Sequence, residues 1–165
     1  MAADGKIHEL AFCKQAEIIC TKFKIGDTKL SQKYSIAGVA DRDVHIYVSE
    51  AAYEKLKQDA RHLLLPDGGI SHLGSYSQWG IRIEHMIPTE VVFRQFEKLH
   101  DAGRLTIDYV EHTIRDRLFC ALITEDEDDR LTDEGWQRRM PDDWDFDTGD
   151  ILARYKAAGI QMHKY

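Results

Sequence analysis

A carboxylate and an imidazole stand next to each other at Glu84 and His85, near the end of an alternating stretch from Trp79 to Pro88. The alternation of apolar and polar residues predicts a strand, and the proline predicts that a helix begins at Thr89. Neighbouring strand residues point to opposite faces, so burying both polar side chains would be costly. In one interpretation His85 forms a hydrogen bond and closes the strand. In the other, Glu84 ligates a metal ion and His85 is a general base.

A second group of candidate residues opens a predicted helix later in the chain. Thr124 is a good N-cap, and Glu127 completes a capping box with it, so we expect a helix over residues 125–138. Every residue from Glu125 to Asp129 is acidic. Acids at a helix N-terminus interact favourably with the macrodipole, which explains part of this run. The run exceeds what capping requires, which leaves room for metal binding by its carboxylates.

The rest of the chain must position these two groups. Helical periodicity and capping signals predict helices over residues 6–24, 49–64, 89–100, 105–118 and 151–158, besides the acidic helix. Extended segments are expected over residues 34–39, 44–48, 79–88 and 119–123. These elements predict an α+β fold, mostly helical, with a small mixed or antiparallel sheet. We expect a single domain over residues 1–165, with an N-terminal region (1–65), a core unit (80–135) and an acidic loop with a C-terminal helix (136–165).

The order strand, helices, strand and acidic helix over residues 80–135 resembles the HNH, or ββα-metal, endonuclease family. The opening Ile83-Glu84-His85-Met86-Ile87-Pro88 is similar to the Asp/His-His-Ile-x-Pro opening of that family. The closing half, residues 121–128, matches where the family carries a ligand His or Asn on its helix. The resemblance implies a metal-dependent hydrolase that cuts DNA phosphodiester bonds. His85 would be the general base, and Mg²⁺ or Mn²⁺ would bind Glu84 with Asp128 or Glu127.

The chain also departs from the pattern of that family. It contains no asparagine, so the residue that orients the base in the family has no counterpart. An acid must replace the final histidine, and no cysteine pairs brace the unit. Two predicted helices separate the strands, where the family often has a loop.

The charge is concentrated in one segment. The whole chain has a net charge of −7. Residues 125–150 hold twelve acids and three arginines, which is −9, so the other residues sum to +2. An acidic segment repels phosphate unless cations occupy part of it. The alternative function is therefore a non-catalytic domain that binds a protein partner through this segment or mimics nucleic acid. A structural or assembly role is the third class.

Other patterns bound the compartment and the partners. Cys13, Cys20 and Cys120 form no C-x-x-C pair, and no apolar run reaches membrane-spanning length. We expect a cytoplasmic protein with no membrane partner, which acts on DNA and could form a homodimer to cut both strands. The alternating acids after Asp143 are similar to a calcium loop, but Arg154 stands where that loop needs a glutamate.

Overall fold

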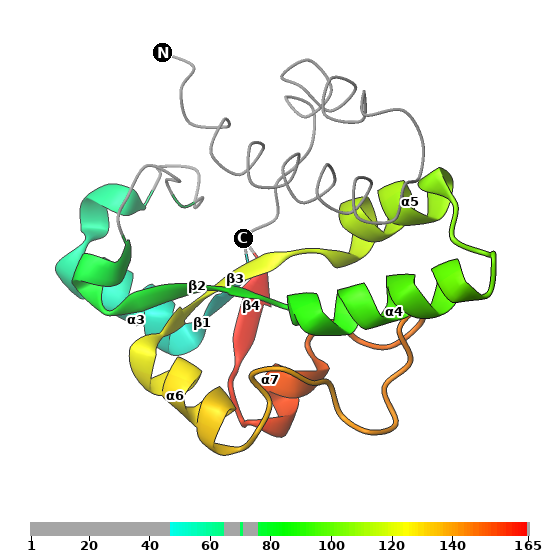
Figure 1. The fold of residues 1–165 in the computed structure, drawn as a ribbon. Helices are drawn as coiled ribbons and strands as arrows, with labels where there is room; N and C mark the ends of the chain where they lie inside the picture. The colour runs from blue at the N-terminus through cyan, green and yellow to red at the C-terminus, as the bar shows by residue number, and fades with distance from the viewer. Residues whose placement is uncertain (1–46, 65–69, 71–75, 165) are drawn as a thin grey trace, which may run out of the picture. The chain divides into compact units, whose positions relative to one another are not determined.

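The computed structural model of the chain describes residues 47–64, 70 and 76–164 (Figure 1). By backbone contacts these residues belong to two compact units. One unit contains the described residues of His45–Gln95 and Leu118–Tyr165, and the other contains Phe96–Arg117. The helix predicted over residues 6–24 and the extended segment predicted over residues 34–39 lie outside the described residues.

The larger unit is built on one mixed sheet of four described strands in the order β2-β3-β1-β4. Strand β1 (Tyr47–Ser49) runs parallel to β3 (Cys120–Thr124), whereas β2 (Ile81–His85) pairs with β3 in antiparallel orientation. Strand β4 (Met162–Lys164) pairs antiparallel with β1. This sheet, together with the helices, confirms the predicted α+β class. Strand β4 was not predicted, because three residues carry no readable periodicity and only the pairing with β1 orders them.

Five described α-helices accompany the sheet: α3 (Glu50–Asp59), α4 (Thr89–Asp101), α5 (Ile107–Arg117), α6 (Glu125–Asp133) and α7 (Ala153–Ala157). Short 3₁₀ turns cover Arg61–Leu63 and Tyr76–Trp79. Helix α6 is shorter than the predicted range of 125–138. It ends where Gly135 adopts a φ of 77° and the amide of Trp136 donates to the carbonyl of Leu131 at 2.6 Å. A left-handed glycine with such a back-bond is a common helix stop.

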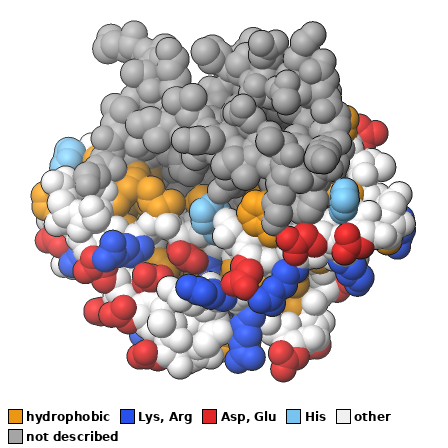
Figure 2. Space-filling model, in the orientation of Figure 1, with side chains coloured by type: hydrophobic (Ala, Val, Ile, Leu, Met, Phe, Trp, Pro, Cys, Tyr) orange, Lys and Arg blue, Asp and Glu red, His pale blue; other side chains and the backbone are white. Residues whose placement is uncertain are grey.

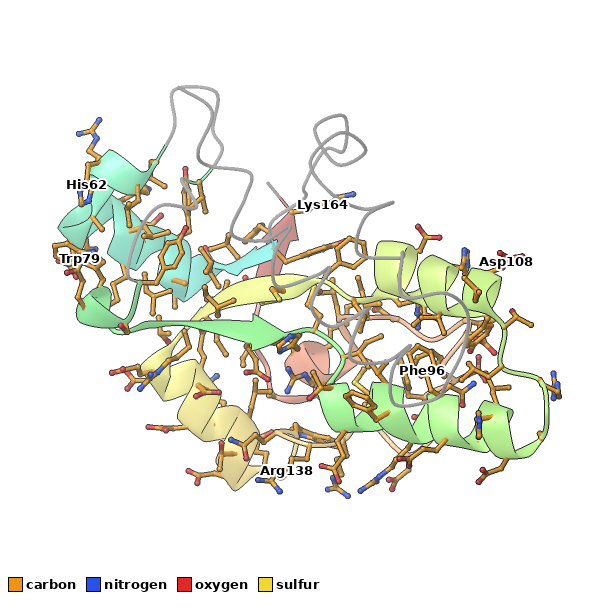
Figure 3. All side chains as sticks on the ribbon, turned by 45° about the horizontal axis from the view of Figure 1, so that its top comes forward. His62, Trp79, Phe96, Asp108, Arg138 and Lys164 are labelled. Atoms are coloured by element: carbon orange, nitrogen blue, oxygen red, sulfur yellow. The ribbon has the colours of Figure 1, made fainter. Side chains whose placement is uncertain are left out.

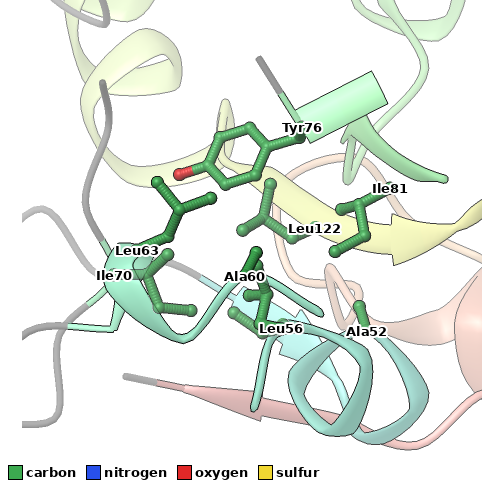
Figure 4. Packing of buried hydrophobic residues seen from close by; sticks show 9 residues of the cluster. Ala52, Leu56, Ala60, Leu63, Ile70, Tyr76, Ile81 and Leu122 are labelled. Atoms are coloured by element: carbon green, nitrogen blue, oxygen red, sulfur yellow. The ribbon is translucent and has the colours of Figure 1, made fainter. Parts of the chain in front are cut away.

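One face of the sheet packs against α3. Val48, Leu122 and Ile81 come from three strands, and Leu56 and Ala52 come from the helix, all of them buried (Figure 4). Ser49 caps α3 by accepting a hydrogen bond from the amide of Ala52 at 3.0 Å. At the edge of this cluster the rings of His62 and Trp79 meet edge to face, 6.0 Å apart (Figure 3). This face therefore holds an apolar core with few polar groups.

The opposite face packs against α6 and α7. Its buried cluster contains Ala121 and Ile123 from β3, Leu131 from α6 and Tyr155 from α7. Side chains alternate along a strand, so residues 121 and 123 of β3 point to this face and residue 122 points to α3. The two helices therefore cover the side of the sheet toward which Glu84 points, because Glu84 pairs with Ala121.

The smaller unit contains the end of α4 and all of α5. Phe96, Leu99 and Val110 are buried, and the rings of Phe96 and Tyr109 meet edge to face at 6.2 Å. Helix α5 begins two residues later than predicted, because Thr106 accepts a hydrogen bond from the amide of Tyr109 at 3.2 Å.

Candidate functional site

Glu84 and His85 close strand β2, and their side chains point to opposite faces of the sheet. Glu84 pairs with Ala121, and His85 pairs with Cys120. Directly paired residues share a face, so Glu84 lies on the α7 side and His85 lies on the other side together with Cys120. Glu84 and His85 are therefore neighbours in sequence, but their side chains have different surroundings.

The carboxylate of Glu84 forms an ion pair with a buried arginine. The guanidinium Nη2 of Arg154 in α7 lies 2.7 Å from Oε1 of Glu84. The side chain of Arg154 is 0% exposed and that of Glu84 is 23% exposed. A buried charge is tolerated only when it is paired and hydrogen-bonded, so this contact is first of all a structural ion pair.

The same guanidinium binds several carbonyl groups. Nε of Arg154 donates to the carbonyl of Met86 at 3.1 Å, and Nη1 donates to the carbonyl of Trp136 at 3.0 Å. Nη2 also donates to the carbonyl of His85 and to the hydroxyl of Tyr155. The planar fork of arginine suits such a set of acceptors, and lysine does not. Arg154 therefore joins the end of β2 to α7 and to the segment after α6.

This role of Arg154 does not follow from the predictions above, in which Arg154 stands out only as a departure from a calcium loop. A signal was present: Arg154 is a cation placed between Ile151 and Tyr155, within the apolar part of the final helix. A charged residue in an apolar stripe is a candidate for a buried ion pair.

His85 is half-buried and held in its neutral form. Burial lowers the pKa of His85 from its ordinary value of 6.5; the Glu84 carboxylate opposes this shift and the Arg154 guanidinium adds to it. Across the ladder, burial raises the pKa of the Cys120 thiol to about 11, with a further contribution from Glu84. Near neutral pH the imidazole can accept a proton, whereas the thiol is not a nucleophile.

The acids that open α6 lie at the other end of β2. Thr124 pairs with Ile81, and the amide of Glu125 donates to the carbonyl of Gly80 at 3.0 Å. The carboxylate of Glu125 forms an ion pair with Arg82 at 2.9 Å. Glu84 lies further along the strand, about 10 Å from Ile81 at about 3.4 Å per residue. The structure therefore does not bring the α6 acids together with Glu84 and His85.

Glu127 is buried and has a structural role. Its Oε2 accepts hydrogen bonds from the Ser49 hydroxyl at 2.5 Å, from the Thr124 amide at 2.9 Å and from the Thr124 hydroxyl at 3.2 Å. The predicted capping box is thus confirmed, and it extends to the N-cap of α3. The other expected ligand, Asp128, is half-buried one position further along α6. Among the residues that the structure describes, no three His, Cys, Asp or Glu side chains are grouped so that they could hold a metal ion.

Three carboxylates of α6 form an outward stripe. Asp126, Asp129 and Asp133 follow each other at helical spacing i, i+3 and i+7, and all three are exposed. We call them the α6 acidic stripe; acidic side chains on the visible surface are red in Figure 2. The opposite side of the helix is buried through Glu127 and Leu131. The surplus acids of this helix therefore point to solvent.

The acidic loop after α6 satisfies two of its own carboxylates. Oδ1 of Asp145 accepts from the amide of Asp147 at 3.1 Å and from the amide and hydroxyl of Thr148 at 2.8 and 2.7 Å. Asp150 accepts from the amide of Leu152 at 2.9 Å and pairs with Lys156 at 2.6 Å. These turn and ion-pair contacts give Asp145 and Asp150 structural roles within the chain.

Comparison with protein-family models, curated proteins and solved structures found no match to this chain. Within the described part of the chain, none of the helices combines the length and the apolar character needed to cross a bilayer.

Proposed function

We propose that this chain is a non-catalytic binding domain that engages a positively charged protein partner through the α6 acidic stripe. One observation carries the proposal: Asp126, Asp129 and Asp133 face solvent, on a helix that begins beside Gly80 and Ile81 and not beside Glu84 and His85. The sequence left two uses for these acids, a metal site if they met Glu84 and His85, and a binding surface if they faced outward. The outward arrangement favours binding.

The requirements of folding account for only part of the stripe. Like charges at i, i+3 and i+4 on one helix repel each other, and acids near a helix C-terminus oppose the macrodipole. Asp126 lies in the favourable first turn, but Asp133 is the last residue of α6 and Glu134 follows as its C-cap. Acidic side chains that disfavour the helix locally are expected where a cationic partner compensates for them.

The matched test removes three charges from each of two helices. One full-length variant carries Asp126→Asn, Asp129→Asn and Asp133→Asn. The control variant carries Glu50→Gln, Glu54→Gln and Asp59→Asn, which are exposed acids of α3. A partner captured by the wild-type chain is purified and titrated against all three proteins at low and high salt.

We expect the stripe variant to bind the captured partner at least about tenfold more weakly than the α3 control, because each charge at a polar rim contributes roughly 0.5–1 kcal/mol. The difference should shrink as salt screens the charges. Equal affinities of the two variants would overturn the proposal.

A second function, an HNH-like endonuclease acting on DNA with Mg²⁺ or Mn²⁺, is favoured by a different observation. His85 retains partial exposure, and its lowered pKa keeps the imidazole neutral, as a general base requires. The metal ligands expected for this function are Glu84 with Asp128 or Glu127. In the structure α6 begins at the other end of β2 from Glu84, and Glu84 already pairs with Arg154.

Plasmid nicking with Mg²⁺ or Mn²⁺ separates the two functions. The wild-type chain is compared with His85→Ala and with His100→Ala, a control at an exposed histidine of α4. Cleavage that needs the divalent ion, is abolished by EDTA and is lost only in His85→Ala would support the nuclease and contradict the non-catalytic domain. Absence of cleavage in all three proteins would contradict the nuclease.

A further inference from the structure

Two exposed arginines follow helix α6 and lack an ion-pair partner. Arg138 and Arg139 belong to the segment between α6 and α7, and Figure 3 shows Arg138 near the end of α6. Exposed acids stand before them at residues 133–134 and after them at residues 142–143. Within the part of the chain that the structure describes, neither arginine forms an ion pair with these acids or with any other. Two cations are therefore left unpaired in the most acidic segment of the chain.

The guanidinium of Arg139 is held in place by a fixed aromatic ring. Its Cζ lies 4.8 Å from the centroid of the Trp136 ring, and its Nε donates to the carbonyl of Gly135 at 3.0 Å. Trp136 is itself anchored, because its amide donates to the carbonyl of Leu131 and its carbonyl accepts from the buried Arg154. A guanidinium positioned in this way loses little conformational entropy when it binds a further group.

The stability of α6 explains part of this arrangement. A cation near the C-terminus of a helix interacts favourably with the macrodipole, and the contact between Arg139 and Gly135 serves this purpose. It uses only Nε of Arg139. The Nη1 and Nη2 groups of Arg139 and the whole guanidinium of Arg138 form no hydrogen bond to the described residues. These donors are therefore available to a partner.

The arginines lie close to the end of the α6 acidic stripe. Asp133 is the last residue of α6, and Gly135 follows two residues later. Two residues span at most about 7 Å, so the guanidinium of Arg139 lies within roughly one Debye length, about 10 Å, of the backbone of Asp133. At that distance a purely cationic partner bound to the stripe would be repelled by Arg139.

We propose that the partner engaged by the α6 acidic stripe also carries a carboxylate, which binds Arg138 and Arg139 beyond the end of α6. This inference rests on the proposed function, because it assigns a second contact to the same partner. Guanidinium groups bind carboxylates through pairs of parallel, charge-assisted hydrogen bonds. The partner surface therefore carries both signs of charge, with cations opposite α6 and an acid about one helical turn further along.

The same charges favour a protein partner over a nucleic acid. A nucleic-acid strand carries a negative charge about every 3.4 Å, so a strand bound at Arg139 would also meet the carboxylates at the end of α6. Those carboxylates repel phosphate. A single acidic side chain on a protein surface reaches the arginines without extending along the acids.

The test uses synthetic helical peptides as the defined partner surface. All of them carry three lysines at i, i+3 and i+7, the spacing of the stripe. Two carry one glutamate a turn beyond the lysines, at the N-terminal or at the C-terminal end, and the third has glutamine at both places. Each is titrated at low salt against the full-length wild type, Arg138→Gln/Arg139→Gln and a control, Lys57→Gln/Arg61→Gln, which removes two exposed cations elsewhere.

We expect one glutamate peptide to bind the wild type at least about threefold more tightly than the glutamine peptide, because an exposed ion pair contributes up to about 1 kcal/mol. This preference should disappear in Arg138→Gln/Arg139→Gln and remain in the control. The glutamine peptide should bind Arg138→Gln/Arg139→Gln more tightly than the wild type, because two repulsive charges are gone. Circular dichroism shows that each variant is folded.

Two results would overturn the carboxylate contact. One is a glutamine peptide that binds the wild type as tightly as both glutamate peptides, and the other is a glutamate preference that survives in Arg138→Gln/Arg139→Gln. The proposed function is read separately, from the loss of binding of all three peptides when the α6 acidic stripe is neutralised. Peptides that do not bind the wild type at all would contradict both proposals.

Discussion

Replacing Arg154 by methionine should destabilise the protein more than any other single change of a charged residue described here. The substitution keeps much of the apolar stem and removes the guanidinium. It leaves Glu84 without its cation and removes the donor that binds the carbonyls of His85, Met86 and Trp136. Breaking a buried ion pair on one side costs about 3–5 kcal/mol.

The position of the carboxylate sets the size of the effect. Arg154 is fully buried, but Glu84 is 23% exposed, so water can partly solvate the orphaned carboxylate. We therefore expect a loss near the lower end, about 3 kcal/mol, against a total stability of about 5–15 kcal/mol for a domain. Arg154→Lys should lose less, about 2 kcal/mol, because it retains the charge but cannot serve all the acceptors.

The assay is urea unfolding of the full-length protein, followed by tryptophan fluorescence and analysed by linear extrapolation. The matched control is Lys156→Met, two positions after Arg154. It removes an exposed cation that forms an ion pair with Asp150. An exposed pair contributes about 0–1 kcal/mol, so the control should remain close to wild type. If Arg154→Met unfolds within 1 kcal/mol of the control, the reasoning about this buried arginine is wrong.

Three further predictions concern single residues of the same unit. Glu127→Ala should lower the free energy of unfolding by about 2 kcal/mol, because the capping box and the Ser49 contact are both lost, whereas Asp126→Ala should change it by less than about 0.5 kcal/mol in the same urea assay. Burial lowers the pKa of His85, so the unfolded chain binds this proton more readily than the folded chain. The free energy of unfolding, measured at several pH values, should therefore rise with pH up to about 6.5. The rise should be smaller in His85→Gln. Because the pKa of Cys120 is about 11, its thiol should react with iodoacetamide at pH 8 about 100-fold more slowly in the folded protein than in urea. The rates are measured in a variant with Cys13→Ser and Cys20→Ser. Equal rates would contradict the burial of Cys120.

Local signals in the sequence were sufficient for much of the fold. The α+β class, the start of α4 after Pro88 and the Thr124–Glu127 capping box followed from periodicity and capping, which depend on neighbouring residues only. The end of α6 and strand β4 depended on a back-bond to Leu131 and on pairing with β1. Such contacts are set by tertiary structure, so a single sequence does not reveal them.

The site was harder to predict for the same reason. The sequence placed Glu84 and His85 correctly at the end of a strand, and alternation correctly put them on opposite faces. It could not show that Thr124 pairs with Ile81, which places the start of α6 at the other end of that strand. It also could not show that Arg154 reaches Glu84 from 70 residues away.

The central claim, that the outward acids of α6 serve a partner, is tested most directly by one ratio of dissociation constants. The captured partner is titrated against the Asp126→Asn/Asp129→Asn/Asp133→Asn protein and against the α3 control at the same salt concentration. We predict that the stripe variant binds at least about tenfold more weakly and that this ratio falls at higher salt. A ratio near one at low salt would contradict the claim.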